Sequence, residues 1–198
     1  MSGRSDCVAA ILLSGGASTR MGHDKTQVLV GGSTLARRTG GLLRGVVETA
    51  IEVGPGVSGL PSIMEPTPRQ GPLAAIASGY EWLCRRGHTA SALVLACDLP
   101  HLSEELLHFL IAWESPDSVV PVVNGIAQPL CAKWGARDLG DARQRVRRGE
   151  RSLRHLSTAP GAVLLHESDW HRVATEQQFF DVDSPDDLRS AGLSSPDG

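Results

Sequence analysis

Two cationic side chains, Arg20 and Lys25, follow the glycine pair Gly15-Gly16 within one short segment. Glycines let backbone N–H groups approach anionic oxygens closely, and the two cations neutralise charge on a polyphosphate. The segment therefore predicts a phosphate-binding loop, although it matches neither G-x-G-x-x-G nor the Gly-Lys-Ser/Thr ending of a P-loop. A solvated glycine-rich turn is the alternative. The residues expected to contact a nucleotide here are Leu13, Ser14, Gly15, Gly16 and Lys25.

A second chemical feature is Asp98, which follows the apolar run 91–96 and precedes Pro100 by two residues. Its carboxylate is expected to emerge at the carboxyl end of a strand, over the same crevice as the glycine loop. Mg²⁺ prefers oxygen ligands and commonly bridges one or two carboxylates to nucleotide phosphates. Asp98 is therefore a predicted magnesium ligand; the alternative is an aspartate that caps a turn or the helix after Ser103.

A third feature is the pair Asp181 and Asp183, which alternates with Phe180 and Val182. Alternation places both carboxylates on one face of a predicted short strand. Asp183 is then a candidate second metal ligand, and Asp181 a candidate contact to the second substrate. The alternative is that these aspartates cap a final helix, for which the segment 184–187 is a good start.

The ordered set of motifs resembles a known family. The pattern Leu-x-Gly-Gly-x-x-x-Arg-Met-Gly-x-Asp-Lys at 13–25 is similar to the signature of the molybdenum cofactor guanylyltransferases, the MobA family. Further matches cover nearly the whole chain: Gly71-Pro72-Leu73-Ala74, Cys97-Asp98-Leu99-Pro100, Gln128-Pro129-Leu130 and the segment 180–188. That family commonly has Asn-x-Asn-Thr-Pro in the last segment, so Asp181 and Asp183 are departures from it.

The resemblance implies where each substrate binds. It places the metal at Asp98, and it places base and ribose recognition in the segment 65–73, where a carboxylate at Glu65 suits the N–H donors of guanine. It places the acceptor near Gln128 and Pro129, where some residues of an arginine cluster suit its phosphate. A plain loop at 65–73 and a solvated arginine helix are the alternatives. The cluster consists of Arg143, Arg145, Arg147, Arg148, Arg151 and Arg154. The nucleotide contacts implied are Glu65, Gly71, Pro72, Leu73 and Asp98, and the acceptor contacts are Gln128, Pro129, Arg151 and Asp181.

The function implied is transfer of GMP from Mg-GTP to the terminal phosphate of molybdenum-bound molybdopterin, with release of pyrophosphate and formation of molybdopterin guanine dinucleotide. Arg20, Lys25 and Asp98 are the expected catalytic residues, and other cofactor-biosynthesis proteins and molybdoenzymes are possible partners. One alternative is a cytidylyltransferase or another nucleotidyltransferase of the same fold. Gly15-Gly16 favours guanine, because the cytidine branch tends to carry Ala-Gly there. The other alternative is a non-catalytic protein that binds GTP and molybdopterin.

Strand and helix patterns alternate along the chain and explain how these residues meet. Such alternation is typical of a three-layer Rossmann-like α/β sandwich with a mostly parallel sheet, in which ligands bind at the carboxyl ends of the strands. Asn124-Gly125 favours a hairpin that adds antiparallel strands to the sheet. The expected strands are 8–13, 46–53, 91–96, 118–123 and 128–134, and the expected helices are 73–86 and one that begins after Ser103.

Composition limits the remaining possibilities. The chain has 198 residues and a net charge of -3, which disfavours a nucleic-acid partner. No apolar run approaches the roughly 20 residues that cross a bilayer, and the polar N-terminus leaves no room for a signal peptide. Four widely spaced cysteines do not suggest a zinc site. We therefore expect one cytoplasmic domain over 1–193, no membrane contact, and a disordered tail at 194–198.

Overall fold

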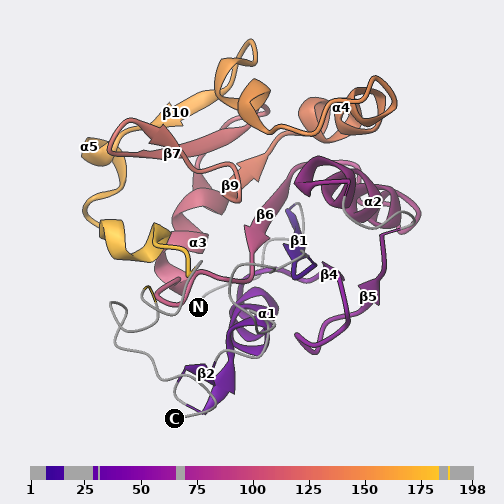
Figure 1. Ribbon diagram of the computed structural model, residues 1–198. Coiled ribbons are helices and arrows are strands. Elements are labelled where there is room, and N and C mark those ends of the chain that lie inside the picture. The colour runs from indigo at the N-terminus through magenta and orange to yellow at the C-terminus, as the bar shows by residue number, and fades with distance from the viewer. Residues whose placement is uncertain (1–7, 16–28, 31, 66–69, 183–186, 188–198) are drawn as a thin grey trace.

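The computed structural model describes residues 8–15, 29–30, 32–65, 70–182 and 187. Its centre is an eight-stranded sheet in the order β10-β7-β9-β6-β1-β4-β5, with β8 paired to β7 (Figure 1). The strands of this sheet are β1 Ala9–Leu13, β4 Ala50–Val53, β5 Ser62–Ile63, β6 Ala92–Ala96, β7 Val119–Val123, β8 Ile126–Ala127, β9 Cys131–Trp134 and β10 Val163–Leu165. A separate antiparallel pair consists of β2 Leu29–Val30 and β3 Ser33–Thr34.

Helices cover both faces of the sheet. The α-helices are α1 Leu35–Val46, α2 Pro72–Cys84, α3 Glu104–Ala112, α4 Ala136–Arg147 and α5 Glu167–Trp170; two 3-10 helices are η2 Arg154–Thr158 and η3 Glu176–Phe179. The core residues of α1, α3 and α5 pack on one face, and those of α2, α4 and η2 pack on the other. The predicted three-layer α/β architecture is therefore confirmed.

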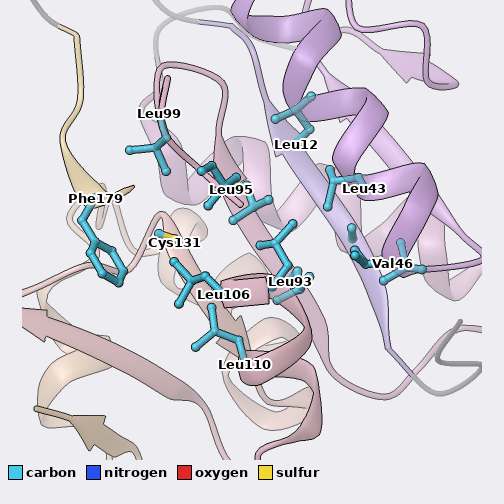
Figure 2. Packing of buried hydrophobic residues seen from close by; sticks show 14 of the residues in the cluster. Leu12, Leu43, Val46, Leu93, Leu95, Leu99, Leu106, Leu110, Cys131 and Phe179 are labelled. Carbon is cyan, nitrogen blue, oxygen red and sulfur yellow. The ribbon is translucent and has the colours of Figure 1, made fainter. Parts of the chain in front are cut away.

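The central strands are buried on both faces, as their continuous apolar sequences predict. In β1, Leu12 faces α1 and α3 while Ile11 faces α2. β1 pairs in parallel with β4 on one side and with β6 on the other. Figure 2 shows the core on the face of the sheet that α1 and α3 cover. There Leu12, Leu93 and Leu95 of the sheet pack with Leu43 and Val46 of α1 and with Leu106 and Leu110 of α3.

Two helices begin where the sequence predicts. Ser103 is the N-cap of α3, and its hydroxyl accepts a hydrogen bond from the backbone N–H of Leu106 at 3.3 Å. α2 begins at Pro72, directly after Gly71, whose φ of 88° suits glycine. Proline at the first helical position needs no N–H partner, which explains the sharp start.

The expected strand 46–53 is too long at its N-terminal end. Val46 is the last residue of α1, a helix that the sequence analysis did not predict, and β4 starts only at Ala50. Thr34 caps α1 by accepting a hydrogen bond from the Arg37 N–H at 3.3 Å. Val46 is fully buried on the inner face of this helix, so its apolar character reflects helix packing and not a strand.

The hairpin at Asn124-Gly125 forms, with φ of 49° and 76° at the two turn residues. Its second strand is β8, however, and not the expected strand 128–134. The Gln128 N–H bonds to the Pro121 carbonyl at 2.8 Å, after which the chain leaves β7. β9 instead pairs antiparallel with β6 and also with β7, which confirms the antiparallel addition.

The C-terminal part differs from expectation in one respect. Residues 180–182 do not form the predicted strand; among the described residues, the Val182 N–H bonds to the Asp98 carbonyl without a strand ladder. The tail 194–198 lies outside the described residues. Within the part of the chain that the structure describes, the helices are too short or too polar to cross a membrane.

Candidate active site

The carboxyl ends of β1, β4 and β6 lie next to each other at one edge of the sheet. The Ser14 N–H donates to the Val53 carbonyl at 3.2 Å, and the Cys97 N–H donates to the Leu13 carbonyl at 3.0 Å. The described start of the predicted phosphate loop, Ser14 and Gly15, is therefore held between the ends of β4 and β6. This is the edge at which open α/β sheets bind ligands.

Asp98 lies where further segments join this edge. The Val182 N–H donates to the Asp98 carbonyl at 3.1 Å, and the Ala96 N–H donates to the Leu130 carbonyl at 2.9 Å. Asp181 is exposed and directly precedes Val182, so its backbone lies near that of Asp98, although more than 80 residues separate the two aspartates in sequence. Asp98 itself is half-buried. The structure brings together the predicted metal, acceptor and phosphate segments.

The donor set around Asp98 suits Mg²⁺ held partly by a substrate. Among the residues that the structure describes, no group of three His, Cys, Asp or Glu side chains is close enough to hold a metal by itself. Mg²⁺ usually keeps several waters and needs only one or two carboxylates together with phosphate oxygens. A single carboxylate at the end of a strand is consistent with this mode of Mg²⁺ coordination.

The predicted base-binding segment starts from β5, at the same edge. The Gly54 N–H donates to the Ile63 carbonyl at 2.9 Å, and Glu65 follows two residues later. Burial raises the pKa of the Glu65 carboxyl above its usual value. The segment continues at Gly71 into the N-terminus of α2, where backbone N–H groups and the helix dipole favour an anion. The Leu73 side chain is fully buried in the core, so its backbone N–H is the group it can offer a ligand.

Arg151 lies against this helix start. A Cβ placed on Gly71 would be 3.5 Å from both the Cβ and the carbonyl oxygen of Arg151. α4 ends at Arg147, so it contains Arg143, Arg145 and Arg147 of the arginine cluster but not Arg151. Arg151 is exposed, as the alternative of a solvated arginine helix expects, but it lies outside the helix and beside Gly71, a predicted nucleotide contact.

A pocket of about 350 Å³ lies beside these residues. It is formed by the β7–β8 hairpin, the segment that enters β9, and the start of η2. Its lining residues are Gly125, Ile126, Ala127, Pro129, Ser152, Leu153 and Arg154. Gln128 precedes Pro129 in sequence, and its side-chain Nε2 donates a hydrogen bond to the Ile126 carbonyl at 3.1 Å. The predicted acceptor residue Pro129 thus lines a mostly apolar pocket with one cationic residue.

Four predicted site residues lie outside the described residues: Gly16, Arg20, Lys25 and Asp183. Their assignments as phosphate, catalytic and metal-binding residues stay predictions. The neighbouring residues Leu13, Ser14 and Gly15 are described and lie at the end of β1.

The sequence analysis missed Glu52, a fully buried residue in the middle of β4. Its carboxylate accepts hydrogen bonds from the Ser14 hydroxyl and from the turn 56–58. Burial opposes its ionisation, but the bonds from Ser14, Ser58 and Val57 lower its pKa below the usual value. A signal was present in the sequence, because a single carboxylate interrupts the apolar run 50–53.

Comparison with known proteins identifies the chain's relatives. The model of the MobA-like NTP transferase domain matches residues 10–163. A relative from Natronomonas pharaonis, named "Probable molybdenum cofactor guanylyltransferase", is 30% identical over 202 residues, which span 91% of this chain and 95% of the relative.

Solved structures share the fold. Molybdopterin-guanine dinucleotide biosynthesis protein A from Archaeoglobus fulgidus superposes with a TM-score of 0.74 at 21% identity, over 93% of this chain and 96% of that one. A 4-diphosphocytidyl-2C-methyl-D-erythritol synthase from Anaerococcus prevotii superposes with a TM-score of 0.67 at 11% identity, over 94% and 96%. At these identities the superpositions show the fold alone.

Proposed function

Because the chain belongs to the MobA-like NTP transferase family, we propose that it transfers GMP from GTP to the terminal phosphate of a molybdopterin, with release of pyrophosphate. The observation that carries the proposal is that three segments bond to the end of β6 at residues 96–98: the end of β1 before the phosphate loop, the segment before β9, and the segment 181–182. A transferase that joins two phosphorylated substrates needs both of them at one place.

The nucleotide binds across the ends of β1, β4 and β5 in this proposal. The backbone N–H group of Gly15, together with Arg20 and Lys25, holds the triphosphate, while the N–H of Ser14 is bonded to the Val53 carbonyl. The Glu65 carboxylate accepts hydrogen bonds from the N1–H and N2–H donors of guanine, and the start of α2 supplies further backbone N–H groups. Base selection therefore depends on the segment 65–73, which is separate from the phosphate loop in sequence but adjacent at the sheet edge.

Asp98, completed by Asp183, is the proposed ligand set for Mg²⁺. The ion, when bound, neutralises charge on the phosphates of the nucleotide. Asp98 suits this task because it lies at the end of β6 next to the end of β1, as the 3.0 Å bond between Cys97 and Leu13 requires. Asp98 therefore lies at the edge of the sheet where the triphosphate is expected.

The acceptor phosphate is already anionic at neutral pH, so the chain has little proton transfer to perform. Its residues contribute alignment of the two substrates and stabilisation of charge at the α-phosphorus and on the leaving pyrophosphate. In this proposal, Arg151 contacts the acceptor phosphate, while Gln128, Pro129 and Asp181 contact the rest of the acceptor; the position of Arg151 beside Gly71 supports its role. The pocket lined by Pro129 and Arg154 gives the acceptor an apolar site next to the nucleotide.

The test is pyrophosphate release by the purified chain with molybdopterin and Mg²⁺, measured in parallel with GTP, CTP, ATP and UTP. We expect release with GTP and none without the acceptor. Release with CTP in place of GTP would contradict the guanine assignment and leave the transferase chemistry intact. Tight nucleotide binding without release from any triphosphate would contradict catalysis and favour a non-catalytic binding protein.

A further inference from the structure

Glu52 carries an ionisable group into the interior of the sheet. It is fully buried, and its partner across the β1–β4 pairing is Leu12. A buried carboxylate is unfavourable unless several donors satisfy it. Here there are five donors: Ser14 Oγ, Gly56 N at 2.9 Å and Val57 N at 3.1 Å on Oε1, and Ser58 N at 2.8 Å and Ser58 Oγ at 2.5 Å on Oε2.

These donors come from two separate parts of the chain. Four belong to the turn 56–58, which follows β4 directly, and such bonds alone would close a turn. The fifth is the Ser14 hydroxyl, 38 residues away in sequence and the first residue after β1. Ser14 is buried, and together with Gly15 it begins the predicted phosphate loop. Glu52 therefore connects this loop to the turn beside it.

The turn is itself held from the opposite side. A Cβ placed on Gly40 of α1 would lie 2.5 Å from the Ser58 carbonyl oxygen, so α1 is packed directly against the turn. Gly54 approaches Ser14 as closely, since a Cβ there would be 2.1 Å from Ser14 Oγ and 2.8 Å from the Gly15 nitrogen. Both groups that Glu52 connects are thus closely packed, Ser14 against Gly54 and the turn against Gly40.

We infer that Glu52 is a positioning residue that acts through Ser14 to hold the start of the phosphate loop in the geometry that binds a nucleotide triphosphate. The inference rests on the proposed nucleotide site but is independent of which base or acceptor is used. Glu52 itself touches no substrate. The loop contacts the phosphates throughout the reaction, so loosening it weakens nucleotide binding more than it slows turnover.

The test is a double-variant cycle on nucleotide affinity, measured by isothermal titration calorimetry with whichever triphosphate the wild-type chain binds. Glu52→Gln keeps the side-chain size but places an amide N–H₂ against donors, and we expect it to weaken binding about tenfold, the scale of one hydrogen bond. Ser14→Ala should weaken binding by several-fold. Because both changes break the same hydrogen bond between Ser14 and Glu52, the double variant should bind the nucleotide no more weakly than Glu52→Gln alone.

Ser58→Ala is the matched control. It removes a hydroxyl bond to the same carboxylate and the 3.2 Å bond from the Leu60 N–H, but it leaves the link to Ser14 intact. It should lower thermal stability while nucleotide affinity stays within about twofold. Equal affinity losses in Ser58→Ala and Glu52→Gln would overturn the inference, because the role of Glu52 would then be structural alone.

Additive losses in the double variant would also overturn it, because Glu52 and Ser14 would then act independently. If Glu52→Gln fails to fold, the comparison of Ser14→Ala with Ser58→Ala decides, and equal affinity in the two contradicts the inference. The proposed function fails separately, when wild-type chain with GTP and acceptor releases no pyrophosphate. Affinity is measured without acceptor, so that failure leaves the cycle interpretable.

Discussion

Asp98 is the residue on which the proposed chemistry depends most. Its backbone carbonyl accepts the Val182 N–H, and its neighbour Cys97 is bonded to the end of β1. The backbone is therefore fixed from two sides, and the carboxylate can be changed without removing these bonds. A substitution by asparagine keeps both backbone bonds and the shape of the side chain, and it removes the charge.

Asp98→Asn should reduce kcat with Mg-GTP by about a hundredfold or more, because an amide is a poor magnesium ligand and carries no charge. The thermal midpoint should change little. Steady-state pyrophosphate release measures the first quantity and calorimetry the second. Asp141→Asn in α4 is the control and should keep wild-type turnover. Turnover of Asp98→Asn within a fewfold of wild type would rule out the metal role.

The ionisation of Glu52 makes the stability of the fold depend on pH. Its folded-state pKa lies below the ordinary 4.5, so the folded chain binds fewer protons than the unfolded chain as pH falls below that value. The ionised network therefore stabilises the fold fully above about pH 4.5, and this contribution is lost as pH falls through the folded pKa.

Urea denaturation from pH 7 to pH 3 should detect this loss. At pH 7, Glu52→Gln should be less stable than wild type by about 2 kcal/mol, the cost of a mismatched buried polar group. The difference should shrink below pH 4.5, since the wild-type carboxyl then becomes neutral as well. A difference that stays constant across the range would show that ionisation of Glu52 contributes nothing.

At the scale of elements, α1 shows how packing decides a helix that propensity disfavours. It contains Gly40, Gly41 and Gly45, and glycine in a helix interior costs about 1 kcal/mol relative to alanine. Gly40 is retained beside the Ser58 carbonyl because a side chain does not fit there, whereas Gly41 meets only the end of the flexible Arg44 side chain, at 3.9 Å. Packing therefore requires glycine at position 40, whereas position 41 has room for a side chain.

Substitution of each glycine by alanine tests this difference in packing. Gly40→Ala should destabilise the chain by about 1–3 kcal/mol, because the new Cβ collides with backbone and displaces the turn 56–58. Gly41→Ala should stabilise it by about 0.5–1 kcal/mol through helix propensity. Chemical denaturation of both variants measures the two changes. Equal effects in the same direction would contradict the packing of α1 on the turn.

At the scale of the whole molecule, one antiparallel strand brings the predicted acceptor residues to the edge of the sheet that carries Asp98. β9 runs opposite to β6, so the residues before it, Pro129 and Leu130, lie beside the end of β6. β7 runs parallel to β6 and places the β7–β8 hairpin at the same edge. The pocket between the hairpin and residues 152–154 is a consequence of this mixed topology.

Filling the pocket should affect one substrate only. Ser152→Phe places a ring in the pocket and should raise the KM for molybdopterin about tenfold or more, while the KM for GTP stays within about twofold, because uniform binding is lost for the acceptor alone. Ser168→Phe, at an exposed position in α5, is the control. Equal increases in both KM values would contradict an acceptor site in this pocket.

The sequence by itself determined the strands around 9–13 and 92–96, the helices α2 and α3, the phosphate-loop motif and the position of Asp98 at a strand end. These depend on continuous apolar runs, capping residues and short motifs, all of which act over a few neighbouring residues. Helix α1 escaped prediction because its three glycines obscure its helical character, and residues 180–182 only resembled a strand through their alternation.

The tertiary structure alone decided the contacts between distant segments: Glu52 with Ser14, Val182 with Asp98, Arg151 with Gly71, and β9 with both β6 and β7. Each joins residues tens of positions apart, and strand order and register are fixed by how whole faces pack and not by local pattern. A lone carboxylate in an apolar run signals that donors must exist, but the fold decides which residues provide them.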